Sequence, residues 1–384
     1  MSTRFPAAIS PNYAEMWQPE LLNIKTQELL TSPFLVSNVK WLSAKTFHFT
    51  HMSVSGFRNH LRTGGYGKGL WAQSDVPYTV AHSRDVEIFV DKADFDETNY
   101  TAGIKNIANT FQKTQSVPET DALFFSKVAH AAANGVYFGD YQKAEAIDGL
   151  VSNTKISAYT NTAVRKIKSY ISKIKIWRSS LVAFVRTEVM DHLEMSSELT
   201  RKVDMVVIPD GGIGIETRYT SIDGVHIFEV IDDERFFEKF VFADRTDDWD
   251  GFKPVVNGYT KNTAAYSATA TYYVIDAETE EYRKAETADF TVDGGVTSFT
   301  AGTNYYLLTT NAAKKINVLI ASLETVITVP KIQSIYFFPP GSHTEGDGYL
   351  FQIREDWDTF IFPNGKNNKV DSIYVDYVKD ESAA

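Results

Sequence analysis

A cluster of glycines beside a lysine is the first group of residues that could do chemistry. Gly64, Gly65, Gly67 and Gly69 surround Lys68 in the segment RTGGYGKGLWAQ. A phosphate-binding loop needs Ser or Thr after its lysine and a glycine six positions before it, where this chain has Gly69 and Arg62. A dinucleotide-binding loop would lead from a buried strand into a helix, whereas strand patterns lie on both sides here. We interpret the cluster as the tip of a flexible hairpin.

Histidines and carboxylates form no arrangement that predicts a metal site or an acid–base pair. His48 and His51 lie three positions apart in a predicted strand, so they lie on opposite faces and cannot share a metal. Two acidic runs do not match the spacing of a calcium loop: Asp232, Asp233 and Glu234, and then Asp244, Asp247, Asp248 and Asp250. We interpret them as solvated loops, with a cation between subunits as the alternative. We therefore expect no catalytic, cofactor-binding or metal-binding residues, and no enzyme.

Composition narrows the class of protein further. The 384 residues are 43% apolar and 13% aromatic, which is typical of a folded chain with a large core. Cysteine is absent, which excludes disulfides, zinc ribbons and thiol nucleophiles. The net charge of −11 argues against a dedicated nucleic-acid-binding protein. We expect no membrane span and no secretion signal, and hence a protein made in the cytoplasm.

The elements that carry the glycine cluster alternate with a period of two and then change to helical spacing. The segment KTFHFTHMSVSGF and Asp85–Val90 predict two long strands around the glycine-rich tip, forming a projecting β-hairpin. A thinly amphipathic helix follows, capped at Asp96 or Thr98 and interrupted or restarted near Pro118. Before the hairpin, a proline-rich arm contains one possible short helix, residues 20–30.

The second half of the chain predicts an α/β region and a β-rich insertion. A basic helix at 163–177, which could contact nucleic acid or simply be solvated, precedes a buried strand at 181–185 and a helix at 188–199. A hairpin turning at Asp223-Gly224 comes next. Residues 251–313 are rich in Thr, Ala, Tyr and Gly and predict a small all-β insertion. Long strands resume after residue 314, and SIYVDYV is the last.

The string DVEIFVDKADFDETN, followed by NIANTF and VPETDALFFSKVA, resembles sequences in major capsid proteins of tailed phages, of the siphophage type that infects Gram-positive bacteria. The IDGVHIFEV hairpin and the late DGYLFQ strand also look similar to that family. The resemblance covers most of residues 35–250 and 314–378 and departs from the family core at 251–313. It implies an α+β, HK97-like major capsid fold.

The resemblance implies a set of domains and a function. We expect an N-terminal arm at 1–45, an extended loop at 46–92, a peripheral domain with a spine helix at 93–159 and 331–384, an axial domain at 160–250 and 314–330, and the insertion at 251–313. Many copies would form hexamers and pentamers of an icosahedral virion shell, assembled in the host cytoplasm and enclosing double-stranded DNA without reading its sequence. Portal, scaffolding and decoration proteins are the other partners implied. The assembly candidates on the hairpin are Gly64, Gly65, Tyr66, Gly67, Lys68 and Trp71.

Two other functions stay open at this stage. An encapsulin-like nanocompartment shell would have the same fold but enclose protein cargo instead of DNA. Alternatively, residues 251–313 could be a carbohydrate- or receptor-binding module on a structural carrier, because their aromatic residues would suit either sugar stacking or a small β core. Some relatives also cross-link a hairpin lysine to an asparagine of a neighbour. Lys68 and Asn364, Asn367 or Asn368 have the right chemistry, but overlap of hairpins is the favoured means of holding the shell together.

Overall fold

The computed structural model describes residues 29–36, 41–43, 45–60, 66–93, 104–138, 142–199, 204–207, 216–264, 266–267, 270–275, 282–293, 296–300, 303–342, 346–363 and 369–379. The chain divides into two compact units, Met1–Glu238 with Lys315–Ala384, and Lys239–Lys314. The insertion expected at 251–313 lies within the second unit. None of the described helices is long and apolar enough to cross a membrane.

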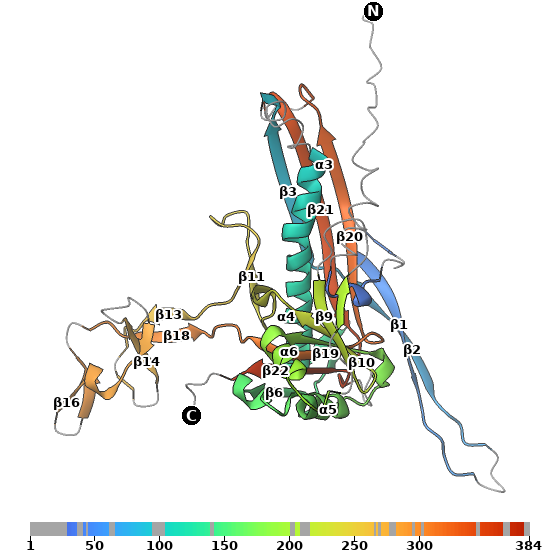
Figure 1. Cartoon of the computed structure of the whole chain (residues 1–384), viewed down its shortest axis with the longest axis horizontal. Coiled ribbons are helices and arrows are strands. Elements are labelled where there is room, and N and C mark those ends of the chain that lie inside the picture. The colour runs from blue at the N-terminus through green and yellow to red at the C-terminus, as the bar shows by residue number, and fades with distance from the viewer. Residues whose placement is uncertain are drawn as a thin grey trace, which may run out of the picture. The chain divides into compact units, whose positions relative to one another are not determined.

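A long helix lying along a three-stranded antiparallel sheet forms one part of the first unit (Figure 1). The sheet has the order β20-β21-β3, with strands Val326–Phe338, Gly348–Ile361 and His82–Asp91. The helix consists of α3 (Ile104–Phe111), a π-helical turn (Gln112–Ser116) and α4 (Val117–Asn134). Ile107, Ala108 and Phe111 of α3 pack against Phe351 and Ile353 of β21.

The expected break at Pro118 is a change of helix type and not an end. Pro118 follows Val117, where the α-helix resumes after the π-helical turn. Proline lacks the N–H and crowds the carbonyl four residues earlier, and the extra residue of a π-helical turn relieves that conflict. The helix ends at Gly135, whose φ of 75° is favourable for glycine.

The sequence predicted a thinly amphipathic helix with a narrow apolar stripe, and this prediction is wrong for α4. Most of the side chains of α4 between Val117 and Ala132 are buried, on more than one side of the helix. The reason is that α4 contacts both the three-stranded sheet and a second, larger sheet, so few of its faces remain for solvent. Burial on both sides includes Glu119 and Asp121, two carboxylates that need partners.

The larger sheet has seven strands and is mixed. Its order is β6-β22-β19-β7-β10-β9-β8, and β10 with β7 and β22 with β6 are the parallel pairs. The strands are β6 Val151–Thr154, β22 Ile373–Val378, β19 Ile316–Ser322, β7 Leu181–Arg186, β10 Val225–Val230, β9 Glu216–Ile222 and β8 Asp204–Val207. The sheet thus joins segments expected in the peripheral domain to segments expected in the axial domain, and the domain boundaries stay a prediction.

Alternation along the central strands divides the core into two layers. Val182 and Phe184 of β7 face α4, where Phe184 packs against Phe124 and Phe125. Ala183 and Val185 point to the opposite face. There they meet α5 (Ala163–Lys173) and α6 (Thr187–Glu194), whose buried residues include Ile167, Ile171 and Leu193. Because both faces are covered, every residue of β7 is buried, as its unbroken apolar sequence predicts.

The projecting hairpin exists, but its second strand differs from the expected one. β1 (Thr46–Val54) pairs with β2 (Trp71–Thr79), in register from Thr46↔Thr79 to Val54↔Trp71. The strand expected as the partner, Asp85–Val90, lies in β3 and pairs with β21 instead. We did not predict β2 as a strand because it contains Pro77, and proline is disfavoured inside a sheet. It is tolerated in edge strands, and both strands of a two-stranded ribbon are edges.

Shorter predictions have mixed outcomes. The turn at Asp223-Gly224 is confirmed, with φ of 52° and 84°. The basic helix ends at Lys173 rather than residue 177, and α6 ends at Glu194 rather than residue 199. The possible arm helix at 20–30 falls mostly outside the described residues, and the caps Asp96 and Thr98 fall entirely outside them. Remaining elements of this unit are β4 Val136–Phe138, β5 Gln142–Ala144, and the 3-10 turns η1 Ser32–Phe34, η3 Ile156–Tyr159, η4 Arg178–Ser180 and η5 Asp233–Arg235.

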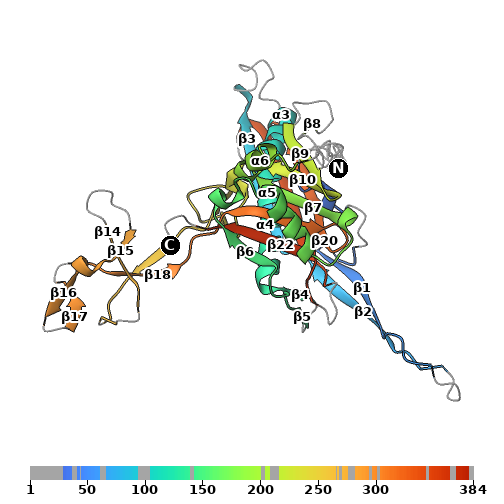
Figure 2. The ribbon, with the colours of Figure 1, turned by 60° about the horizontal axis from the view of Figure 1, so that its bottom comes forward.

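The second unit is built from strands, as its composition predicts (Figure 2). Its main sheet has the order β13-β18-β14-β15, formed by Gly258–Lys261, Tyr306–Thr310, Tyr272–Ile275 and Tyr282–Lys284. Two two-stranded pairs accompany it: β11 Phe240–Phe242 with β12 Phe252–Pro254, and β16 Phe290–Asp293 with β17 Val296–Phe299. The 3-10 turn η6 covers Thr287–Asp289. Tyr272, Val274 and Tyr305 form its small core with Phe290 and Phe299. The mixed α and β character expected of the whole chain is confirmed.

Candidate assembly site

The base of the hairpin is fixed to the first unit by an aromatic cluster. Phe47 of β1 and Tyr78 of β2 stack with their centroids 5.8 Å apart, and both meet the ring of Phe360 edge-on. Phe49 stacks on Phe362 at 4.4 Å. Burial of the Tyr78 side chain raises the pKa of its phenol to about 12. The hairpin therefore leaves the body from a rigid root.

The distal part of the hairpin carries apolar side chains that remain exposed. Tyr66 is 94% exposed and Trp71 is 68% exposed, and Phe57, Val54 and Leu70 are exposed as well. A two-stranded ribbon is marginally stable alone, and large apolar side chains in water favour contact with another surface. The hairpin thus presents an unsatisfied apolar surface far from its root.

The six assembly candidates fall on this distal part as far as the structure describes them. Tyr66, Gly67 and Lys68 lie in the connection before β2, and Trp71 is the first residue of β2; all four are exposed. Gly64 and Gly65 lie outside the described residues. A Cβ at Gly67 would lie 3.3 Å from the Cβ of Arg58, a tight contact that would require Arg58 to shift by a few tenths of an ångström. Whether the six residues contact a neighbour stays a prediction.

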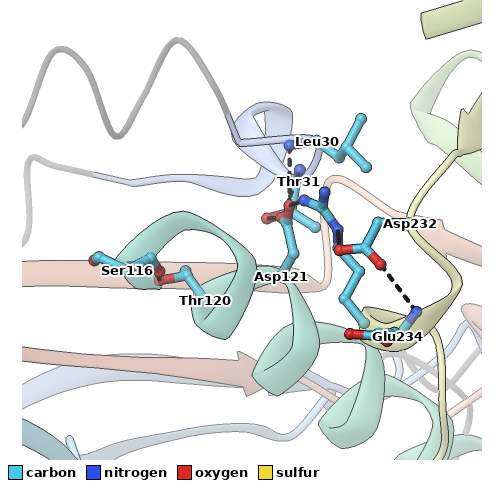
Figure 3. Close-up of polar contacts among 8 residues, drawn as sticks. Leu30, Thr31, Ser116, Thr120, Asp121, Asp232 and Glu234 are labelled. Atoms are coloured by element: carbon cyan, nitrogen blue, oxygen red, sulfur yellow. Dashed lines mark hydrogen bonds and ion pairs between the residues drawn. The ribbon is translucent and has the colours of Figure 1, made fainter. Parts of the chain in front are cut away.

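An N-terminal strap, residues 29–36, is tied to the long helix at Asp121 (Figure 3). The carboxylate of Asp121 accepts hydrogen bonds from the backbone N–H of Leu30 at 3.4 Å and of Thr31 at 3.2 Å, and from the Thr31 hydroxyl at 2.7 Å. Arg235 completes the junction, with its Nη1 3.1 Å from Asp121 and its Nε 3.2 Å from Asp232. Asp232 also caps η5 by accepting from Glu234 N–H.

Apolar contacts and electrostatics both act at this junction. Phe34 packs on Phe124 with 4.9 Å between centroids, and Val36 N–H donates to the carbonyl of Thr328 in β20. Complete burial raises the pKa of Asp121 from its usual range, while Arg235 and the donors of Thr31 act in the opposite direction. The strap, the long helix and the loop after β10 are thereby held at one point.

Three further buried carboxylates lie on β21, and each is bound by a different element. Gln112 and Ser116 are the first and last residues of the π-helical turn, and both donate hydrogen bonds to the carboxylate of Glu355. The bond from Ser116 is 2.9 Å long. Asp358 pairs with Lys127 of α4 and accepts from Ala81 N–H, at 3.0 Å, just before β3. Asp356 accepts from the Ser83 hydroxyl and lies 3.8 Å from Lys45. These carboxylates connect separate elements to the sheet instead of facing one another as a catalytic pair would.

Residues of the two acidic runs, 232–234 and 244–250, form ion pairs and turn hydrogen bonds within the chain. Asp233 pairs with Arg186, and Asp244 N–H bonds to Asp247 within a turn. Among the residues that the structure describes, no group of three or more His, Asp or Glu could hold a metal. The acidic runs therefore serve as ion-pair partners and turn residues, close to the solvated loops expected.

Basic side chains of helix α5 form ion pairs and a cation–π contact with other residues of the same chain. Arg165 pairs with Glu198, and Lys168 lies 3.6 Å from Asp223. Lys173 lies over the ring of Tyr374, 5.0 Å from its centroid. Ile167, Ile171 and Ile174, which recur at helical spacing, are buried. Because these basic side chains contact residues of their own chain, the arrangement favours a solvated helix over one that contacts nucleic acid.

The junctions at Asp121 and Glu355 were missed in the sequence. The available signal was the presence of Glu119 and Asp121 directly before Ala122, in a helix with an apolar pattern. Buried acids in such a position need paired or hydrogen-bonding partners, so they mark inter-element contacts. The cross-link question stays open, because Lys68 is described and exposed whereas Asn364, Asn367 and Asn368 lie outside the described residues.

No protein-family model and no curated protein matches this chain. Among solved structures, it is similar to the capsid of the cyanophage P-SCSP1u and to the mature capsid of bacteriophage PhiM1. Both have a TM-score of 0.45 and 11% identity over 90% of this chain, and cover 86% and 85% of the other chain respectively. A virus-like particle from Pyrococcus furiosus is similar with a TM-score of 0.40 and 10% identity, over 96% of this chain and 99% of that chain.

Proposed function

We propose that this chain is the major structural subunit of an icosahedral phage head, a shell that encloses double-stranded DNA. The observation that carries the proposal is the hairpin β1–β2, rooted in an aromatic cluster and exposing apolar residues such as Tyr66 and Trp71 along its distal part. A rigidly rooted ribbon with an apolar end is suited to lie across a neighbouring copy.

Distribution of contacts supports the same function. The strap at 29–36 is anchored on the long helix, and the N-terminal arm expected from the sequence would contact another subunit. Hairpin and arm would each bury modest area, and closed symmetry repeats every contact around the shell. The helix lying along the three-stranded sheet would provide stiffness, and the seven-stranded sheet with α5 and α6 would meet its counterparts in hexamers and pentamers.

The proposal that the shell encloses DNA rests on the resemblance to capsid proteins in sequence, and the charge of the chain is compatible with it. A subunit of net charge −11 has no general affinity for phosphates, which suits a container that must not grip its contents. The role is structural, and we assign no catalytic residues. Host cytoplasm as the place of assembly, and portal, scaffolding and decoration proteins as partners, belong to this proposal.

The test is assembly of the purified full-length chain, followed by electron microscopy and light scattering. Trp71→Asp should leave a folded subunit, because its side chain is exposed, yet abolish regular particles. Val256→Asp is the matched control: Val256 is also apolar and exposed, but it lies in the second unit, outside the elements proposed to contact other subunits. Normal particles from Trp71→Asp would contradict the hairpin's role. Particles that contain protein cargo and no DNA when isolated from cells would instead favour the nanocompartment shell.

A further inference from the structure

One face of the main sheet in the second unit has a composition that the shell function does not require. The opposite face contributes Tyr272, Val274 and Leu307 to the small core. Because side chains alternate along a strand, Tyr273, Ile275, Tyr306 and Leu308 must lie on the other face. This second face is here named the tyrosine face.

The register of the strands places four of its residues in a single row across the sheet. Lys261 of β13 is paired with Tyr306 of β18, Tyr306 with Tyr273 of β14, and Tyr273 with Lys284 of β15. Directly paired residues share a face of an antiparallel sheet. At the usual spacing of strands, the row extends for about 14 Å. It therefore reads lysine, tyrosine, tyrosine, lysine.

A third tyrosine extends the aromatic surface beside this row. Tyr259 is paired with Leu308, so it lies on the same face one step further along β13 and β18. Its ring meets that of Tyr273 with centroids 5.0 Å apart and planes inclined by 58°. The two rings come from strands on either side of β18, so they lie over the middle of the sheet. Both tyrosines are half-buried, and the lysines at the ends of the row are exposed.

We propose that the tyrosine face binds an acidic polysaccharide whose carboxylates are separated by uncharged sugars. A pyranose ring has an apolar C–H face that stacks on an aromatic ring. The ammonium groups of Lys261 and Lys284, at opposite ends of the row, complement carboxylates that flank a stacked sugar.

Charge distinguishes this occupant from a nucleic acid, which also stacks on aromatic rings. Residues 239–314 contain seven Lys and Arg against eleven Asp and Glu. A chain with a phosphate on every nucleotide needs a continuous basic groove, and two lysines within an acidic unit do not make one. A sparsely charged polysaccharide places its negative groups only where the row supplies a lysine.

The test uses the full-length protein and measures binding of hyaluronan oligosaccharides, in which uronic acids alternate with uncharged sugars. Oligosaccharides of amylose and a single-stranded oligo(dT) serve as the uncharged and nucleic-acid probes. Tyr273→Leu/Tyr306→Leu keeps apolar bulk on the strands but removes the flat rings, and should weaken hyaluronan binding about tenfold or more. Lys261→Ala/Lys284→Ala should weaken it similarly and reduce its dependence on salt.

The control for charge is Lys113→Ala/Lys175→Ala, which removes two exposed lysines from the first unit and should leave binding unchanged. Thermal unfolding of every variant shows whether the second unit still folds. If the leucine variant does not fold, the Lys261→Ala/Lys284→Ala variant tests the proposal, because it changes only exposed side chains. Absent hyaluronan binding would overturn the proposal, as would equal effects of the control variant. Equal or tighter binding of oligo(dT) or amylose at the same residues would overturn it too. Loss of particles with no glycan binding would assign the face to contact with a second copy.

Discussion

Thr31 gives both its backbone N–H and its hydroxyl to a single oxygen of Asp121, at 3.2 and 2.7 Å. The two residues are 90 positions apart in sequence, and both are fully buried. The strap is thus attached to the long helix both by this polar contact and by an apolar contact between Phe34 and Phe124. If the chain assembles as proposed, this contact holds residues 29–36 on their own subunit.

The first prediction concerns this attachment. Thr31→Val keeps the shape and the backbone N–H but removes the hydroxyl donor to a buried carboxylate, which should cost about 1.5–3 kcal/mol of unfolding free energy. Denaturant titration gives that value, and hydrogen exchange should show faster exchange of the amides of residues 29–36. Thr110→Val, which removes an exposed hydroxyl bonded within its own helix, should cost less than about 0.5 kcal/mol. Equal costs for the two variants would show that the strap is held by its apolar contacts alone.

The second prediction concerns the π-helical turn. Glu355→Ala removes the acceptor of both Gln112 and Ser116, two buried polar residues at the ends of that turn. Leaving them without this acceptor should destabilise the first unit by about 2–4 kcal/mol. Glu87→Ala on β3 is a matched control, since Glu87 is exposed and bonds to Gln352 at the surface of the same sheet. A loss below about 1 kcal/mol for Glu355→Ala would mean that the turn does not depend on the carboxylate.

Local patterns in the sequence predicted the strands, the long helix and the β-rich unit, but not which distant segments meet. The alternation from residue 45 onward identified β1, and the apolar run at 181–185 identified β7. The partner of Asp85–Val90 is β21, more than 250 positions away, and no period in the sequence encodes that pairing. We predicted the hairpin by pairing β1 with the next clear strand pattern along the chain. The strand that does pair with β1 is β2, which we did not predict because it contains Pro77.

The assembly candidates could be chosen from the sequence because aromatic residues beside glycines are a local signal, and their contact with a neighbour stays a prediction. The buried junctions were not, because Asp121 becomes meaningful only when Thr31 and Arg235 reach it from two other parts of the chain. The row on the tyrosine face depends likewise on the register of four strands. Composition indicated an aromatic β module, whereas the order lysine, tyrosine, tyrosine, lysine required the structure.

The third prediction concerns acid stability of the second unit. Nη1 and Nη2 of Arg283 donate to the two carboxylate oxygens of Asp289, at 2.7 and 2.8 Å, and these bonds lower the pKa of the Asp289 carboxyl below its usual 3.8. A depressed pKa means that the carboxylate stabilises the folded state above pH 3.8 and that this contribution is lost as the pH falls through the lowered value. Arg283→Gln should therefore flatten the acid limb of the unfolding curve for this unit, followed by tyrosine resonances in NMR spectra. An unchanged acid limb would contradict the pairing.

The fourth prediction concerns the root of the hairpin at alkaline pH. Tyr78 is 8% exposed, and burial raises its pKa from 10.0 to about 12, so the folded state keeps the phenol protonated where the unfolded state ionises. Its contribution to stability is fully present below pH 10 and is lost as the pH rises through about 12. The root formed by Phe47, Tyr78 and Phe360 should then loosen over that range. Tyr78→Phe keeps the stacked ring but cannot ionise, so it should retain more stability than the wild type between pH 10 and 12, measured by thermal unfolding at each pH. Hydrogen exchange of the β1 and β2 amides locates the effect: exchange that accelerates equally in both proteins would mean that another group, and not Tyr78, governs the alkaline opening of the hairpin.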